Sequence, residues 1–140
     1  MGNGRRALRL IETARTWRPA EPLEYTVIDP FEMVPGGLSL KAAHQMLART
    51  GARYRLIPGD PLAAMAATAN SLPGQQLVIL TIPAEPEVRA ALWFYVPRLL
   101  ADDALVYLAD TSGPGASCVL RPVSREEVQA RAAAARRRAA

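Results

Sequence analysis

The sequence predicts an α/β protein with three layers, in which helices cover both faces of a mainly parallel sheet. Segments with helical spacing of apolar residues alternate four times with short runs rich in β-branched and aliphatic residues. Right-handed crossovers turn such an alternation into a parallel sheet. The strand predicted at 75–82, QQLVILTI, is apolar without alternation, as in a strand covered on both faces, so we place it at the sheet's centre.

The first half of the chain supplies two helices and two strands. Apolar residues of 7–17 fall on one helical stripe, and the run LEYTVIDP at 23–30 has strand composition. Ser39 suits the N-cap of a second helix, which Gly51 ends. The run RYRLI at 53–57 is the next strand.

The following elements are marked by prolines and a cap. Asp60 suits an N-cap and Pro61 a first helical turn, so a helix is predicted immediately after the strand. A further helix starts near Pro86, and Pro97 is expected to kink it or cut it short. The run ALVYLAD at 104–110 is a strand.

The chain ends in a short strand at 117–123 and a segment rich in alanine and arginine at 124–140. Ser124 and Glu127 have capping-box spacing. Because Val128 is the large apolar residue there, we expect a solvated helix or tail outside a Rossmann-like domain at 1–123. Contact of this basic segment with an anionic partner is the less favoured interpretation.

Composition excludes several classes of function. The net charge is +4, but four of the seventeen basic residues lie in the last ten positions, and no basic face interleaved with aromatics is visible, so nucleic acid is an unlikely partner. The single cysteine, Cys118, excludes an intramolecular disulfide and a His/Cys metal site and favours the cytoplasm. No apolar run reaches the ~18 residues of a membrane span, so no membrane association is expected.

Ligands of parallel sheets bind where the strands end, near the point at which strand order reverses. The polar or glycine residues at these ends and at the first helix start are the candidate site: Gly2, Asn3, Gly4, Asp29, Gly59, Asp60 and Thr81.

Three segments, GNGRRALRLIE, YTVIDPFE and LIPGDP, resemble in order the cofactor-binding segments of class I methyltransferases, a Rossmann-like family that uses S-adenosylmethionine. FYVPRLLADDALVYLAD is similar to a later helix, turn and strand of that family, so the resemblance runs from Gly2 to about Asp110. It implies that a glycine-rich turn passes the methionine part of the cofactor, that an acidic residue takes the ribose hydroxyls, and that a Gly-Asp pair lies by the adenine. The resemblance therefore implies a small-molecule methyl acceptor and cofactor contacts at Gly2, Asn3, Gly4, Asp29, Gly59 and Asp60.

Each position has its own physical reason. Gly2 and Gly4 lack a Cβ, so a carboxylate could approach a helix amino end that carries roughly half a positive charge. Asp29 could accept from both ribose hydroxyls. Asp60 could accept from an adenine amino group, but a purely structural N-cap is an equally good interpretation.

The family's first strand lies in the middle of its sheet, and this sequence starts just after the place where that strand would end. Losing about four buried side chains removes roughly 6 to 12 kcal/mol, comparable to the ~5 to 15 kcal/mol stability of a whole domain, and leaves two strand edges unpaired. We therefore expect the functional polypeptide to extend upstream of Met1. The rival expectation is a complete chain whose neighbouring strands close up, or in which a partner subunit, as in a homodimer, fills the gap.

No residue can be assigned to the methyl acceptor. Thr81 stands where many family members carry an acidic or Asn-Pro motif, and it cannot act as a base at neutral pH. Methyl transfer needs alignment more than acid–base help, so turnover remains compatible with this sequence. The alternative function is a non-catalytic α/β binding module whose basic tail contacts an anionic partner. A nicotinamide enzyme is a weaker third option, with Ala7 at the final position of G-x-G-x-x-G, and a P-loop is excluded because Gly-Lys-Ser/Thr is absent.

Overall fold

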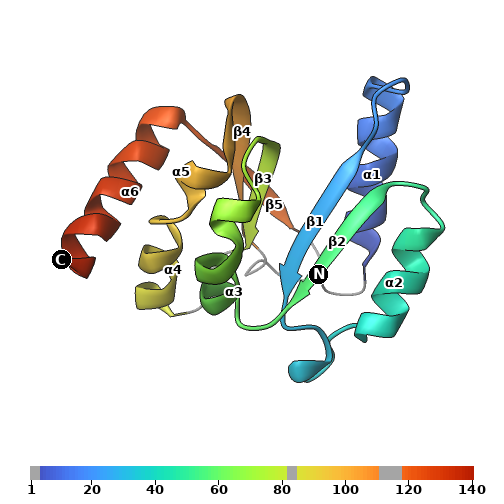
Figure 1. Cartoon of the computed structure of the whole chain (residues 1–140), viewed down its shortest axis with the longest axis horizontal. Helices are drawn as coiled ribbons and strands as arrows, with labels where there is room; N and C mark the ends of the chain where they lie inside the picture. The colour runs from blue at the N-terminus through green and yellow to red at the C-terminus, as the bar shows by residue number, and fades with distance from the viewer. Residues whose placement is uncertain (1–3, 82–84, 111–117) are drawn as a thin grey trace. The chain divides into compact units, whose positions relative to one another are not determined.

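The computed structural model describes residues 4–81, 85–110 and 118–140. Its contacts divide the chain into two compact units, Met1–Ala64 and Met65–Ala140. We call them unit 1 and unit 2 and describe each by itself (Figure 1).

Unit 1 is a two-stranded parallel sheet covered by two helices. Its elements are α1 (Arg5–Trp17), β1 (Glu24–Asp29), α2 (Leu40–Ala48) and β2 (Arg53–Pro58). The register of β1 and β2 runs from Glu24 opposite Arg53 to Asp29 opposite Pro58. All four elements were predicted within a few residues, and the parallel pairing of the two strands is confirmed.

Local signals and one apolar cluster explain why unit 1 folds this way. The Ser39 hydroxyl accepts the Ala42 N–H at 3.1 Å, the predicted cap of α2. The apolar faces of α1 and α2 meet the sheet in a cluster made of Ala7, Ile11, Leu47 and Ala52, with Leu23, Tyr25, Met46, Tyr54 and Leu56 packed against it. Burial in this cluster raises the pKa of Tyr25 above its ordinary value of 10.0, against a smaller lowering effect of Arg6.

Unit 2 contains a three-stranded mixed sheet and its helices. Helix α3 (Pro61–Thr68) crosses the boundary, and β3 (Gln75–Thr81), α4 (Pro86–Leu92), α5 (Val96–Leu99), β4 (Leu100–Asp110), β5 (Val119–Val123) and α6 (Arg125–Ala139) follow. The strand order is β3-β4-β5, with β3 and β4 parallel and β4 and β5 antiparallel. As predicted, Pro97 does not sit inside a continuous helix: it lies in the first turn of α5, after α4 has ended.

The mixed α/β class is confirmed, but hydrogen bonds join the described strands in two sheets. Within the described strands, the central place predicted for β3 is wrong, because β3 is an edge of its sheet and Leu77 is 47% exposed. Strand β4 takes the middle instead and buries Val106, Leu108 and Ala109. No helix in the described part of the chain has both the length and the apolar character needed to cross a membrane.

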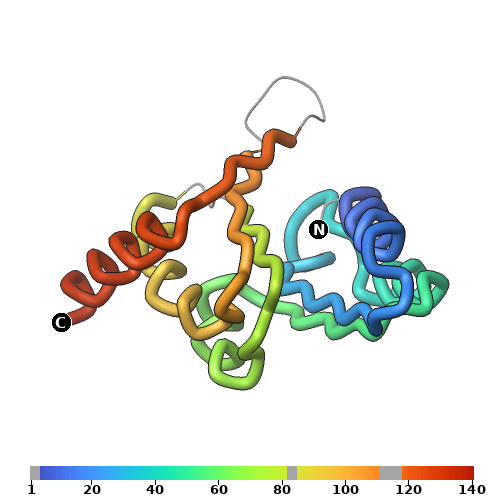
Figure 2. Tube along the Cα trace, turned by 90° about the horizontal axis from the view of Figure 1, so that it is seen from above, coloured from blue at the N-terminus to red at the C-terminus, as the bar shows by residue number. Residues whose placement is uncertain are grey.

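Helix α6 is packed rather than solvated, which corrects the prediction for 124–140. Its helical form was predicted, and Ser124 caps it by accepting the Glu127 N–H at 3.1 Å. Val128, Ala132 and Ala135 are buried at helical spacing, and both views show α6 alongside α4 and α5 (Figures 1 and 2). Small alanines let this helix approach its neighbours closely although it carries few large apolar side chains.

Candidate functional site

The strands of unit 1 end level with each other, which brings two predicted site residues together. Asp29 ends β1 opposite Pro58, the last residue of β2. Gly59, which follows Pro58, donates its N–H to the Asp29 carbonyl oxygen at 3.2 Å. A Cβ at Gly59, whose φ is +142°, would meet no atom within 4 Å. The space beside this backbone is therefore open at the strand ends, where ligands of parallel sheets bind.

The Asp29 carboxylate holds the loop that follows β1. Its Oδ1 accepts the Phe31 N–H at 2.7 Å. Phe31 is 1% exposed and has a φ of +50°, in the left-handed region that side chains other than glycine rarely adopt. Such strain is stored preferentially at functional sites, so the outlier marks this strand end for attention.

Gly37 completes the loop. A Cβ at this position would lie 1.8 Å from the Phe31 carbonyl oxygen, so no residue with a side chain fits there without moving the loop. Sequence reasoning missed both Phe31 and Gly37. The Gly36–Gly37 pair was a visible signal of close backbone approach, but nothing in it names Phe31 as the residue approached.

Asp60 has the structural role that the sequence offered as one of two interpretations. Its Oδ1 accepts the Ala63 N–H at 2.9 Å and so caps α3. The side chain is exposed, so the cap and a ligand contact are not mutually exclusive.

Gly4 stands immediately before α1 with a φ of +79°. In Figure 1, α1 runs opposite to β1, so its amino end lies at the end of unit 1 where β1 stops. A Cβ on Gly4 would lie 2.4 Å from the Met46 sulfur. The helix amino end is therefore covered at Gly4 rather than bare, contrary to the sequence-based expectation, while the predicted contacts Gly2 and Asn3 lie outside the described residues.

Two further kinds of candidate site are a polar residue at a strand end of unit 2 and a metal site. Thr81 ends β3 in unit 2 and is exposed. Within residues 4–81, 85–110 and 118–140, no group of three or more His, Cys, Asp or Glu side chains is arranged to hold a metal ion.

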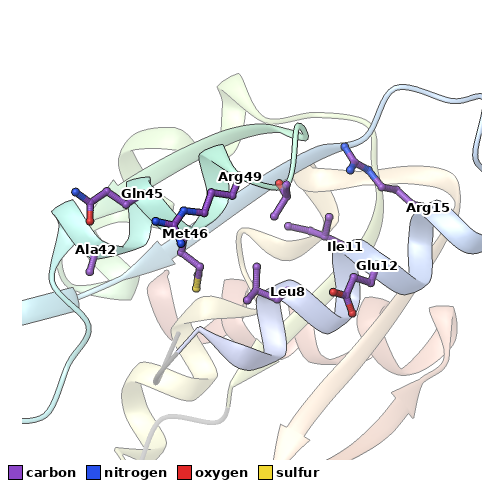
Figure 3. A pocket seen from close by; sticks show the side chains of 9 residues that line it. Leu8, Ile11, Glu12, Arg15, Ala42, Gln45, Met46 and Arg49 are labelled. Carbon is purple, nitrogen blue, oxygen red and sulfur yellow. The ribbon is translucent and has the colours of Figure 1, made fainter.

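A second feature of unit 1, a groove between α1 and α2, was not predicted. Its volume is about 520 Å³. Figure 3 shows side chains from both helices around it, with Leu8 and Met46 extending toward one another. The groove is lined by Leu8, Ile11, Glu12, Arg15, Ala42, Gln45, Met46, Arg49 and Thr50.

The groove combines an apolar floor with charges at its rim. Ile11 is 2% exposed, and Leu8 and Met46 are half-buried. Glu12, Arg15 and Arg49 are exposed at its sides. Sequence periodicity gave Leu8 and Ile11 as core residues but could not show that the two helices stay apart there.

Comparison with known proteins assigns no function to the strand ends at Asp29 or to the groove between α1 and α2. No family model matches the sequence, and no curated protein or solved structure matches it either.

Proposed function

We propose that this chain is an S-adenosylmethionine-dependent methyltransferase-like protein, built on a Rossmann-like sheet whose described strands correspond to strands 2 to 5 of that fold, and acting on a small-molecule acceptor. The observation that carries the proposal is the pairing of the strands. In the doubly wound strand order 3-2-1-4-5-6, strand 1 separates strand 2 from strand 4. Without it, the neighbours that remain in contact are 3 with 2, and 4 with 5.

Both of these pairs are present. In this correspondence, β1, β2, β3 and β4 are matched in chain order to strands 2, 3, 4 and 5. β1 pairs with β2, and β3 pairs with β4, each in parallel. The antiparallel β5 beside β4 is compatible with this order, because doubly wound sheets often carry an antiparallel edge strand.

The composition of β3 supports the same order. A strand without polar alternation is normally covered on both faces and paired on both sides, whereas β3 is an edge that exposes Leu77. An uncharged edge strand is also a liability that proteins usually avoid. The composition of β3 is therefore that of strand 4 in the doubly wound order, although β3 is an edge among the described strands.

Within unit 1, Asp29 and Gly59 are the residues best placed to contact the cofactor. A carboxylate offers about four lone-pair sites, so Asp29 can serve the Phe31 N–H and a ribose hydroxyl together. When bound, S-adenosylmethionine supplies a methyl group on a sulfonium, and the protein's contribution to such a displacement is alignment. Asp29 would fix the ribose, and the open backbone at Gly59 would admit the adenine.

The test is calorimetric titration with S-adenosylmethionine and S-adenosylhomocysteine, comparing the wild-type protein with Asp29→Asn. Asparagine keeps an oxygen for the Phe31 N–H, so the loop is retained while the charge that binds the hydroxyls is removed. We expect binding to weaken by about tenfold, the equivalent of one charge-assisted hydrogen bond of ~1.4 kcal/mol. Asp103→Asn, an exposed position on β4, is the matched control and should bind as the wild type does.

Failure of the folded wild-type protein to bind either compound would overturn the proposal. It would leave the alternative, a non-catalytic module that contacts an anionic partner through Arg136, Arg137 and Arg138, which are exposed at the end of α6. That alternative predicts salt-sensitive binding of polyglutamate that is lost when the three arginines are replaced by glutamine.

A further inference from the structure

We propose that the free edge of β3 pairs with β3 of a second copy of this chain. The two strands run antiparallel across a two-fold axis, so that two three-stranded sheets join into one. The paired edge belongs to unit 2, so dimerisation does not depend on cofactor binding at Asp29 in unit 1.

The edges of the described sheets differ in how they are protected against pairing with another chain. An edge strand presents a row of unpaired backbone N–H and C=O groups, and proteins usually block it with charged residues or proline. In unit 1, β1 begins at Glu24 and β2 begins at Arg53. In unit 2, the edge strand β5 carries Arg121 and Pro122. These three edges therefore have the usual protection.

Strand β3 is the unprotected edge among the described strands. Its seven residues, QQLVILT, include no charged residue and no proline, and Leu77 is 47% exposed. An exposed apolar edge of this kind is a template for pairing with another strand. In the doubly wound order, strand 4 has a neighbour on each side, and a second copy supplies the neighbour that β3 lacks among the described strands.

The lack of charge identifies the strand that fits. A charged strand laid beside β3 would bring charges without partners against an uncharged edge. Each of β1, β2, β4 and β5 carries at least one charged residue. Among the described strands, the one that matches the edge of β3 in charge is therefore β3 itself.

The length of β3 determines the register. A two-fold axis at Val78, the midpoint of Gln75–Thr81, pairs the strand with itself along its full length. The cross-strand pairs, one residue from each subunit, are Gln75 with Thr81, Gln76 with Leu80, Leu77 with Ile79, and Val78 with Val78. None is charged, and apolar cross-strand pairs stabilise a sheet. Each edge is occupied by the other, so the assembly closes as a dimer.

The test is the oligomeric state of the full chain, measured by sedimentation equilibrium over a range of concentrations. We expect a reversible monomer–dimer equilibrium for the wild type. Leu77→Lys places two ammonium groups close to the two-fold axis, and like charges at an interface should raise the dimer dissociation constant by about tenfold or more. Circular dichroism verifies that this variant is folded, as expected for a side chain that is 47% exposed.

Leu105→Lys is the matched control. Leu105 lies beside Leu77 in the register of β3 and β4, so both side chains are on one face of the sheet, and Leu105 is 58% exposed. It differs from Leu77 because β4 lies between β3 and β5 and has no free edge. Leu105→Lys should dimerise as the wild type does. An equal loss in both variants would show that copies pack through the sheet face, and would overturn the proposal.

A cysteine at the axis tests the register independently of Leu77→Lys. Cys118→Ser removes the single cysteine of the chain, and Val78→Cys then places one thiol in each subunit at the axis. Residues directly opposite in an antiparallel pair lie within the Cα separation of about 4.4–6.8 Å that a disulfide requires. We expect a covalent dimer on mild oxidation, and none for Leu105→Cys in the same background.

Four results would each contradict edge pairing. They are a wild-type chain that stays monomeric at about 1 mM, assemblies larger than a dimer, an unchanged dimer in Leu77→Lys, and a Val78→Cys variant that forms no covalent dimer.

Discussion

The two units hold their helices and loops in place by different means. In unit 1, the loop after β1 depends on backbone fit: the Asp29 carboxylate holds the strained Phe31, and Gly37 leaves room for the Phe31 carbonyl. In unit 2, helix α6 depends on close side-chain packing through small residues such as Ala132. In both units, stability should therefore be most sensitive to enlarging a small residue. In unit 1 the added side chain would clash with backbone, and in unit 2 it would overfill the packing between side chains.

The two units also differ in how their charged side chains are paired. In unit 2, the Glu127 carboxylate accepts from Arg121 and from Arg131, at 3.1 and 2.6 Å, and the Arg131 guanidinium lies 4.9 Å from the centre of the Trp93 ring. These groups link β5, α6 and the segment after α4. In unit 1, by contrast, the ion pairs of Arg18 with Glu21 and of Arg53 with Glu24 have more exposed side chains, at 58–79%. Exposed ion pairs contribute little to stability, so the Glu127 network of unit 2 should be the more sensitive to substitution.

The largest expected effect is that of Gly37→Ala. The added Cβ would lie 1.8 Å from a backbone oxygen, so the loop must move and the Asp29 to Phe31 hydrogen bond must be lost or distorted. We expect a loss of about 3 kcal/mol in the free energy of unfolding of unit 1. Urea titration followed at the ¹³C methyl signal of Met46 measures it.

Gly36→Ala is the matched control for this position. Gly36 has a φ of +75° but open space around it, so alanine there carries a conformational penalty of about 1 kcal/mol without a clash. Equal losses for the two variants would show that the contact with the Phe31 carbonyl does not determine the loop.

A smaller loss is expected for Ala132→Leu in unit 2. Ala132 is 1% exposed on the packed face of α6, and overfilling such a site costs about 2 kcal/mol. Fluorescence of Trp93, which is 3% exposed, reports unfolding of unit 2 once Trp17, which is 81% exposed, is replaced by phenylalanine. Ala130→Leu on the exposed face should change stability by less than about 0.5 kcal/mol; a similar loss there would mean that α6 is not packed as described.

The features predicted correctly from the sequence are those determined by neighbouring residues. Ser39, Asp60 and Ser124 each cap a helix as their positions before helical segments indicated. The strands ending at Asp29 and Pro58 were also visible as short runs bounded by proline or glycine, and their parallel pairing follows from the helix between them.

The features that could not be predicted depend on contacts distant in the sequence. Coverage of Gly4 by Met46 needs the position of α2 relative to α1, and the φ of Phe31 needs Gly37. The apolar composition of β3 predicts that both of its faces are covered. It does not predict which strands pair with β3 through hydrogen bonds. The buried face of α6 was not predicted because its alanines contribute little to hydrophobic periodicity, which depends mainly on large side chains.

The smallest expected effect is the pH dependence of the stability that Glu127 contributes through its contacts with Arg121 and Arg131. Hydrogen bonds from Arg121 and then Arg131 hold the pKa of Glu127 below its ordinary value of 4.5. A depressed folded pKa stabilises the folded state above that ordinary value, and the contribution is lost as the pH falls through the lower, folded value. Glu127→Gln should therefore slightly lower the thermal midpoint of unit 2 at pH 7, and the difference from wild type should shrink below about pH 4.5. The control is Glu126→Gln, one residue earlier in the same first turn, and a difference for Glu127→Gln that stays constant across this range would show that its arginine contacts do not contribute to folding.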